Sequence, residues 1–186
     1  IGCEARVTVI DLNLRRLKEL DDQFSSSLNT IYSTVDAIEK HVMNSDLVIG
    51  AVLVPGAAAP RLVTEDMIKG MRNGAVIVDV AIDQGGCIET AHATTHDDPT
   101  YKVHDVVHYC VANMPGAVAR TSTFALNNAT LPFMLALADK GFAQAMKDDA
   151  HLKAGLNVHG GKVTYQAVAN DLNLGYQPAD EVLAAL

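Results

Sequence analysis

The stretch Val76-Ile77-Val78-Asp79-Val80-Ala81-Ile82-Asp83-Gln84-Gly85-Gly86 decides the fold class. Its apolar, mostly β-branched residues predict a strand that is buried on both faces, as in parallel sheets covered by helices. We expect this strand to end at Asp83, just before the Gly-Gly turn. Ligands of open α/β sheets bind at the edge where the parallel strands end. The Asp83 carboxylate is therefore a ligand contact, a proton-transfer group, or only a helix cap or turn residue.

The flanking sequence alternates predicted strands with predicted helices. Apolar runs predict strands at residues 7–10, 30–32, 47–54 and 106–111. Apolar residues at helical spacing predict helices at 14–24, 35–43 and 65–71, the first capped by Asn13 and the last by Thr64. Strands separated by helices form βαβ units with right-handed crossovers. The sequence thus predicts an α/β fold with a Rossmann-like, doubly wound parallel sheet.

The pattern changes near residue 119. From there we expect one long helix, capped by Thr121-Ser122-Thr123, bent at Pro132 and ended by Gly141. A helical, polar tail follows it. We therefore predict one domain over residues 1–119, and a connecting helix with its tail over residues 120–186.

Composition narrows the class of protein. The 186 residues carry a formal charge of −8, which argues against nucleic acid or an anionic membrane as the main partner but not against a nucleotide. Cys3, Cys87 and Cys110 are odd in number and lack metal-binding spacing, which favours a reducing cytoplasm. No apolar run approaches the roughly 20 residues that span a bilayer. The chain begins at a strand entrance without Met, so we expect it to be part of a longer protein.

Asp11 ends the first predicted strand, directly before a helix. In dinucleotide-binding folds, an acid at the end of the second strand accepts hydrogen bonds from the adenosine ribose, and it favours NAD over NADP. The alternatives are a solvated turn residue or the corresponding acid of an S-adenosylmethionine-dependent methyltransferase. A glycine-rich turn about 20 residues upstream would decide the cofactor class, and it would precede Ile1.

Two further strand ends carry candidate residues. Val52 and Leu53 precede a Pro-Gly turn and either pack against a cofactor or only end a strand. Asn113 and Met114 follow the last predicted strand. The Asn113 amide can bind a ribose hydroxyl or a nicotinamide carboxamide, or it can form an Asx turn before Pro115.

Two pairs of histidines have the spacing of metal ligands on a helix, His92 with His96 and His104 with His108. The first pair lies in a polar loop. The second lies at a strand entrance, where residues four apart are about 13 Å from each other. We expect no metal site.

Taken together, several stretches resemble bacterial alanine dehydrogenase over essentially the whole chain. They are Val9-Ile10-Asp11, Ala51-Val52-Leu53-Val54-Pro55-Gly56, Asp79-Val80-Ala81-Ile82-Asp83-Gln84-Gly85-Gly86-Cys87 and Tyr109-Cys110-Val111-Ala112-Asn113-Met114-Pro115. The resemblance implies NAD-dependent, reversible oxidative deamination of L-alanine to pyruvate and ammonia. It also implies a homohexamer in the cytoplasm.

The resemblance further implies roles for individual residues. Asp83 is the implied catalytic carboxylate, and the helix after Arg120 is implied to return to a substrate domain formed mostly by upstream residues. The family's catalytic His, its substrate-binding Lys and Arg, and its glycine-rich loop would precede Ile1. The implied cofactor contacts are Asp11, Arg16 and Ser33 at the adenosine, Val52 and Leu53 along the cofactor, and Val80, Ala81, Ile82, Asp83, Val111, Ala112, Asn113 and Met114 around the nicotinamide half.

The resemblance leaves alternatives open. The NAD-binding subunit of a proton-translocating transhydrogenase has a similar domain but no catalytic acid at the position of Asp83, because hydride passes directly between two nucleotides. Saccharopine-metabolising relatives, a methyltransferase and a non-catalytic NAD-binding fragment are further alternatives. Some relatives have a Glu and a His where this chain has Ala136 and Lys140, so we expect no cation site on that helix.

Overall fold

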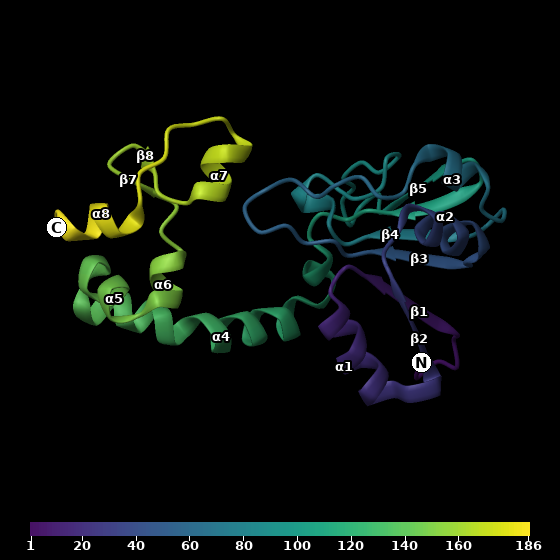
Figure 1. The fold of residues 1–186 in the computed structure, drawn as a ribbon, viewed down its shortest axis with the longest axis horizontal. Helices are drawn as coiled ribbons and strands as arrows, with labels where there is room; N and C mark the ends of the chain where they lie inside the picture. Colours follow the sequence, from purple (N-terminus) through teal and green to yellow (C-terminus); the bar gives the residue numbers. More distant parts are fainter. The chain divides into compact units, whose positions relative to one another are not determined.

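The computed structural model describes residues 1–186, and they form two compact units (Figure 1). The sheet unit comprises Ile1–Val52 and Pro60–Ala112, and the helical unit comprises Leu53–Ala59 and Asn113–Leu186. The sequence predicts a domain boundary at residues 119–120. The division between the two compact units falls at residues 112–113, and the short segment Leu53–Ala59 belongs to the helical unit.

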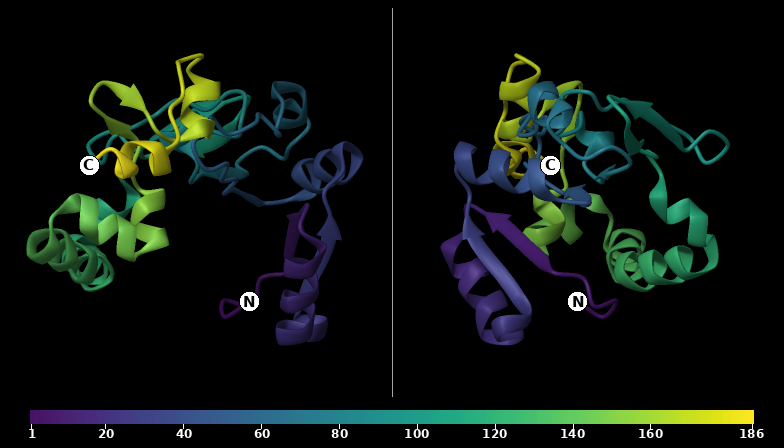
Figure 2. Two further views of the ribbon diagram at one scale, coloured as in Figure 1. Left: turned by 60° about the vertical axis from the view of Figure 1, so that its left-hand side comes forward. Right: turned by 90° about the vertical axis from the view of Figure 1, so that its right-hand side faces the viewer.

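The strands of the sheet unit form two sheets rather than the single sheet expected. In the first, β1 (Val7–Asp11) pairs in parallel with β2 (Leu28–Tyr32), and α1 (Leu14–Phe24) lies beside this pair (Figure 2). The second has the order β3-β4-β6-β5, formed by β3 (Leu47–Gly50), β4 (Val76–Asp79), β6 (Val106–Tyr109) and β5 (Thr100–Val103). Its pairs are parallel except for β5 with β6. The predicted parallel α/β class is confirmed.

The helices of the sheet unit begin where their capping residues place them. The side chains of Asn13, Thr34 and Thr64 accept hydrogen bonds from backbone N–H groups in the first turns of α1, α2 (Val35–Asn44) and α3 (Glu65–Lys69). Such caps each contribute about 1 kcal/mol. The caps at Asn13 and Thr64 are those that the sequence predicts.

The core of the sheet unit surrounds β4. Ile77 at its centre is fully buried, as are Ile68 of α3 and Val106 of β6. β3, in contrast, is an edge strand whose outward residues Leu47 and Ile49 are 53% and 60% exposed. The apolar run that predicts a strand buried on both faces therefore describes β4 well and β3 poorly.

The end of β4 corrects the sequence analysis. The strand stops at Asp79, four residues before Asp83, and a 3₁₀ turn, η2 (Ile82–Gln84), carries Asp83 instead. The physical reason is the Asp79 side chain, which is completely buried and accepts a hydrogen bond from the backbone N–H of Ala81. That bond turns the chain away from the sheet. β3 likewise ends at Gly50, short of the expected residue 54.

The antiparallel strand β5 was not predicted. It forms a hairpin with β6 through His104 and Asp105, whose φ angles are 51° and 60°. Positive φ at both central residues is the geometry of a type I′ turn, which Asn-Gly or Asp-Gly usually supplies. The His-Asp pair gives no such signal in the sequence.

The helical unit contains one long helix followed by short elements. Gly141, with φ of 74°, ends α4 as expected, but α4 begins at Ala119, so Thr121–Thr123 lie inside its first turns and do not cap it. No residue of α4 is buried, and no helix of the structure is long and apolar enough to cross a membrane. The elements are η3 (Met114–Val118), α4 (Ala119–Lys140), α5 (Phe142–Asp148), α6 (Ala150–Ala154), the hairpin of β7 (Val158–His159) and β8 (Lys162–Val163), α7 (Gln166–Asp171) and α8 (Ala179–Ala184).

Candidate functional site

The parallel pairing of β3, β4 and β6 brings their carboxyl ends to one edge of the sheet. Gly50 is paired with Asp79, and Val78 with Tyr109. The backbone N–H of Val80 donates to the carbonyl of Gly50 over 2.7 Å, so the chain after β4 starts beside the end of β3. Of the predicted site residues, this edge carries Val52, Val80, Ala81, Ile82, Asp83, Val111 and Ala112.

The loop after β4 presents the Asp83 carboxylate to solvent. Its neighbours Ala81 and Ile82 are buried, with 4% and 8% exposure, whereas Asp83 is exposed. The backbone N–H groups of Gln84 and Gly86 both donate to the carbonyl of Ala81, at 2.9 and 3.0 Å. Asp83 supplies no capping bond to η2. The cap interpretation that the sequence left open is therefore not what the structure has, and the carboxylate is available to a ligand.

The same edge of the sheet also contains a residue that was not singled out from the sequence, Asp79. Its carboxylate is completely buried below the Asp83 loop and accepts backbone hydrogen bonds from Ala81 and Cys87, at 3.1 and 3.0 Å. An acid inside an apolar strand was the available signal, because a charge is buried only where hydrogen bonds compensate for lost water.

The Cys87 thiol lies against this carboxylate, with Sγ 3.6 Å from Asp79 Oδ1. Burial, and then the negative charge of Asp79, raise the pKa of Cys87 to about 11. The sulfur therefore stays protonated at neutral pH and donates to the carboxylate, and it is a weak nucleophile.

Asp11 and Ser33 lie together at the ends of β1 and β2. The backbone N–H of Ser33 donates to the carbonyl of Asp11, and both residues are half-buried. Asp11 Oδ1 accepts from the backbone N–H of Asn13 at 2.8 Å. The turn role and the ribose-binding role are thus compatible, because a carboxylate has a second oxygen. Arg16 is exposed and pairs with Glu19 at 3.2 Å.

The remaining predicted contacts belong to the helical unit. Leu53 is 65% exposed, Asn113 is exposed and Met114 is half-buried. Asn113 precedes η3 without capping it through its side chain, and its carbonyl accepts from the backbone N–H of Gly116.

The histidine pairs engage separate partners. His104 lies 2.8 Å from the Glu65 carboxylate, and His108 is buried with Nε2 2.8 Å from Thr90 Oγ1. Burial is the main cause that lowers the pKa of His108. The chain has no group of three or more His, Cys, Asp or Glu side chains that could hold a metal ion.

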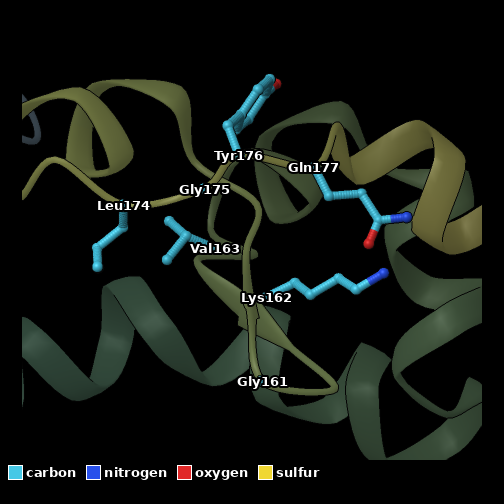
Figure 3. A pocket seen from close by; sticks show the side chains of 7 residues that line it. All are labelled: Gly161, Lys162, Val163, Leu174, Gly175, Tyr176 and Gln177. Carbon is cyan, nitrogen blue, oxygen red and sulfur yellow. The ribbon is translucent and has the colours of Figure 1, made fainter.

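A hollow in the helical unit involves none of the predicted site residues. Its volume is about 520 Å³, and it lies beside the β7–β8 hairpin (Figure 3). The Lys162 side chain extends along it, and Tyr176 points away from its centre. The lining residues are Gly161, Lys162, Val163, Leu174, Gly175, Tyr176 and Gln177.

The sheet edge fits a dinucleotide in chemical character. Val80 is 47% exposed although it follows a buried strand, and Asp83, three residues further along the chain, is exposed as well. Exposed apolar side chains with one polar group are what an aromatic ring bound at such an edge requires. Fold and edge together define an α/β nucleotide-binding type of domain.

The comparison with known families makes this specific. Residues 1–166 match the model of the alanine dehydrogenase/PNT C-terminal domain, and the chain belongs to this family. It is 61% identical over 98% of its length to alanine dehydrogenase of Halomonas elongata and 58% identical over 98% to alanine dehydrogenase 2 of Staphylococcus aureus. It covers 49% and 50% of those proteins, so it spans about half the length of the relatives it matches.

Solved structures give the same result. An L-alanine dehydrogenase superposes with a TM-score of 0.80 at 49% identity, covering 92% of this chain and 47% of that one. A transhydrogenase from Sinorhizobium meliloti superposes with a TM-score of 0.57 at 27% identity, covering 64% of this chain and 35% of that one. The predicted family and fold are confirmed.

Proposed function

We propose that residues 1–186 are the cofactor-binding half of an NAD-dependent L-alanine dehydrogenase, which reversibly converts L-alanine to pyruvate and ammonia. One observation supports this most. An exposed carboxylate, Asp83, lies in the short loop that follows the central parallel strand β4, in a chain that is 61% identical to an alanine dehydrogenase. Alanine dehydrogenases of this family depend on NAD. When bound, NAD supplies the acceptor for the hydride that leaves the substrate carbon.

Asp83 is the catalytic residue in this proposal. Removing hydride from an amine-bearing carbon leaves a C=N group, which water must attack before ammonia can leave. A carboxylate can orient this water and take its proton. The exposure of Asp83 above two buried neighbours suits that role, since the carboxylate reaches solvent while its backbone is anchored.

The other predicted residues would bind the cofactor. Asp11 would accept hydrogen bonds from the adenosine ribose through the oxygen that does not bind Asn13, with Ser33 beside it and Arg16 near the adenosine. The proposed apolar and nicotinamide-side contacts are Val52, Leu53, Val80, Ala81, Ile82, Val111, Ala112, Asn113 and Met114.

We further propose a cytoplasmic homo-oligomer, a hexamer by family resemblance. The all-round exposure of α4 supports an assembled protein. Phe124, Leu126 and Met134 are about 60% exposed or more, at 59%, 66% and 60%. Apolar area of this extent usually contacts another surface.

The test uses a full-length hybrid in which residues 1–186 follow the N-terminal half of the Halomonas elongata relative, with that relative as the positive control. We expect the hybrid to reduce NAD in the presence of L-alanine. We expect the 186-residue chain alone to be inactive, because the family's other catalytic groups would lie in the N-terminal half. A hybrid that binds NADH but does not oxidise alanine would overturn the proposal.

The transhydrogenase NAD-binding subunit is the second candidate, since the Sinorhizobium meliloti structure shares the fold. The two candidates differ in their need for an acid at Asp83. Hydride transfer between two nucleotides without alanine oxidation would favour the transhydrogenase.

A further inference from the structure

The carboxylate of Asp79 closes the loop that carries Asp83. Oδ1 accepts from the backbone N–H of Ala81 at 3.1 Å, and Oδ2 accepts from the backbone N–H of Cys87 at 3.0 Å. Ala81 precedes η2 and Cys87 follows it. One side chain therefore holds both ends of the loop, and Asp83 lies between the two points of attachment.

Two glycines leave the space that the Asp79 carboxylate and the Cys87 thiol occupy. A Cβ on Gly86, whose φ is 74°, would lie 2.9 Å from Asp79 Oδ2, and a Cβ on Gly50 would collide with Cys87 Sγ. Both positions are thus held free of side chains where the backbone approaches the Asp79–Cys87 contact. The Asp79 side chain makes no ion pair with Lys or Arg, and backbone N–H groups and one thiol are its partners.

Burying a carboxylate without a cation is costly, and such groups persist only where hydrogen bonds satisfy them. An apolar residue could fill the same space, but it would leave the buried backbone N–H groups of Ala81 and Cys87 without an acceptor. What the carboxylate adds is a pair of directional bonds to specific amides. Those bonds determine the path of the loop rather than the packing of the sheet.

We propose that Asp79 is a positioning residue that sets the location of the Asp83 carboxylate by holding the amides of Ala81 and Cys87. This inference rests on the proposed function, because it assigns Asp79 a role in the reaction through Asp83. Asp79 itself is completely buried and does not touch the substrate.

Asp79→Asn in the full-length hybrid tests the proposal. An Asn side chain keeps the shape but has one acceptor oxygen, so one of the two amide bonds is lost. We expect kcat for alanine oxidation to fall about 10- to 100-fold, since small misplacements of catalytic groups have effects of this size. The KM for alanine and the affinity for NADH should change less than about threefold, because the proposed adenosine contacts and the substrate-binding groups expected upstream both lie outside the Asp83 loop.

A double-mutant cycle separates positioning from a general structural role. If Asp79 acts through Asp83, then adding Asp79→Asn to Asp83→Asn should lower kcat by less than about twofold more, because residues that act as a unit are not additive. Fully multiplicative losses would overturn the proposal, as would an unchanged kcat in Asp79→Asn. Asp66→Asn is the matched control, since its side chain is exposed on α3 and should leave kcat unchanged.

Amide hydrogen exchange supplies a readout that does not depend on activity. In Asp79→Asn, exchange should accelerate at Ala81 or Cys87, with β4 still protected. If Asp79→Asn does not fold, Gly86→Ala makes the same test by crowding Oδ2. A wild-type hybrid without alanine oxidation would refute the proposed function, and faster exchange would still support the loop attachment. Unchanged exchange at both amides overturns the attachment whether or not the enzyme is active.

Discussion

The ends of β4 and β1 both carry aspartate, but the two regions use it differently. At β4 the strand-end residue Asp79 is completely buried, and a second acid, Asp83, is the one that solvent reaches. At β1 the single residue Asp11 is half-buried, and it both binds the turn at Asn13 and faces outward. At β4, Asp79 holds the loop and Asp83 is available to a ligand. At β1, Asp11 has both roles.

The difference teaches what each region can tolerate. At β4, Asp83 can be substituted without loss of the buried hydrogen bonds, because these bonds are made by the Asp79 side chain. At β1 any change to Asp11 alters the turn and the outward face together. A single substitution should therefore separate chemistry from structure at β4, whereas at β1 a substitution of Asp11 needs a second variant that changes only the turn as its control.

The largest effect should come from Asp83→Asn in the full-length hybrid. We expect kcat to fall about 10²- to 10⁴-fold, the usual contribution of a general acid–base group. The dissociation constant for NADH, measured by fluorescence titration, should stay within about threefold of wild type. Near-normal turnover would show that Asp83 is not the catalytic carboxylate.

Asp11→Ala should have a smaller effect, and on binding rather than turnover. Losing a hydrogen bond between a charged group and a ribose hydroxyl costs about 1.5–3 kcal/mol, so the KM for NAD should rise about 10- to 100-fold. The kcat at saturating NAD should change little. Asn13→Ala is the control, because it removes the α1 cap and destabilises by about 1 kcal/mol without removing the carboxylate. Equal KM values in both variants would contradict a ribose contact.

Two glycine variants measure how closely the β4 loop surrounds its carboxylate. Gly86 and Gly74 both have positive φ, of 74° and 82°. A Cβ added to Gly86 would contact Asp79, whereas a Cβ added to Gly74 would have no atom within 4 Å. Gly74→Ala should cost about 1–3 kcal/mol from backbone strain alone. Gly86→Ala should cost more, and the difference in unfolding free energy by urea titration reports the crowding of Asp79. Equal losses of unfolding free energy in the two variants would show that the loop moves to accommodate the added methyl group.

Titration of the Cys87 thiol, which contacts Asp79, should have the smallest effect on stability. Its pKa is raised from its ordinary value of 9.0 to about 11, so the folded state favours the protonated form. Its contribution to stability is full below pH 9 and is lost as the pH rises from about 9 to about 11. At pH 9, alkylation of the native chain followed by mass spectrometry should label the exposed Cys3 and spare Cys87. Rapid labelling of Cys87 would contradict the buried contact.

Local chemistry made much of the fold predictable. The capping side chains of Asn13 and Thr64 fix the starts of α1 and α3, and the apolar run before Asp79 fixes the central strand. The end of that strand was misplaced, because an apolar run does not show where ladder hydrogen bonds stop. Asp79 ends it through bonds that depend on the folded loop.

The candidate site was less accessible to sequence reasoning. The sequence singled out Asp83 as a candidate, and the structure shows that it is exposed. The buried residue Asp79 was missed because its environment depends on Cys87, eight residues away, and on the space left by Gly50. The β5–β6 hairpin was missed because its turn lacks glycine. The roles of Asp11, Arg16 and Ser33 in binding the adenosine stay predictions, and the Asp11→Ala variant tests the first of them.

The open side of β3 has a consequence for handling the 186-residue chain. An outer strand with unpaired backbone groups is a template on which another polypeptide can add a strand. Leu47 and Ile49 make the exposed part of β3 apolar and uncharged. The strand also contains no Lys or Pro, the residues that hinder the pairing of a further strand with a sheet edge. We therefore expect the 186-residue chain expressed alone to aggregate through this edge, and covering the edge should keep the chain in solution.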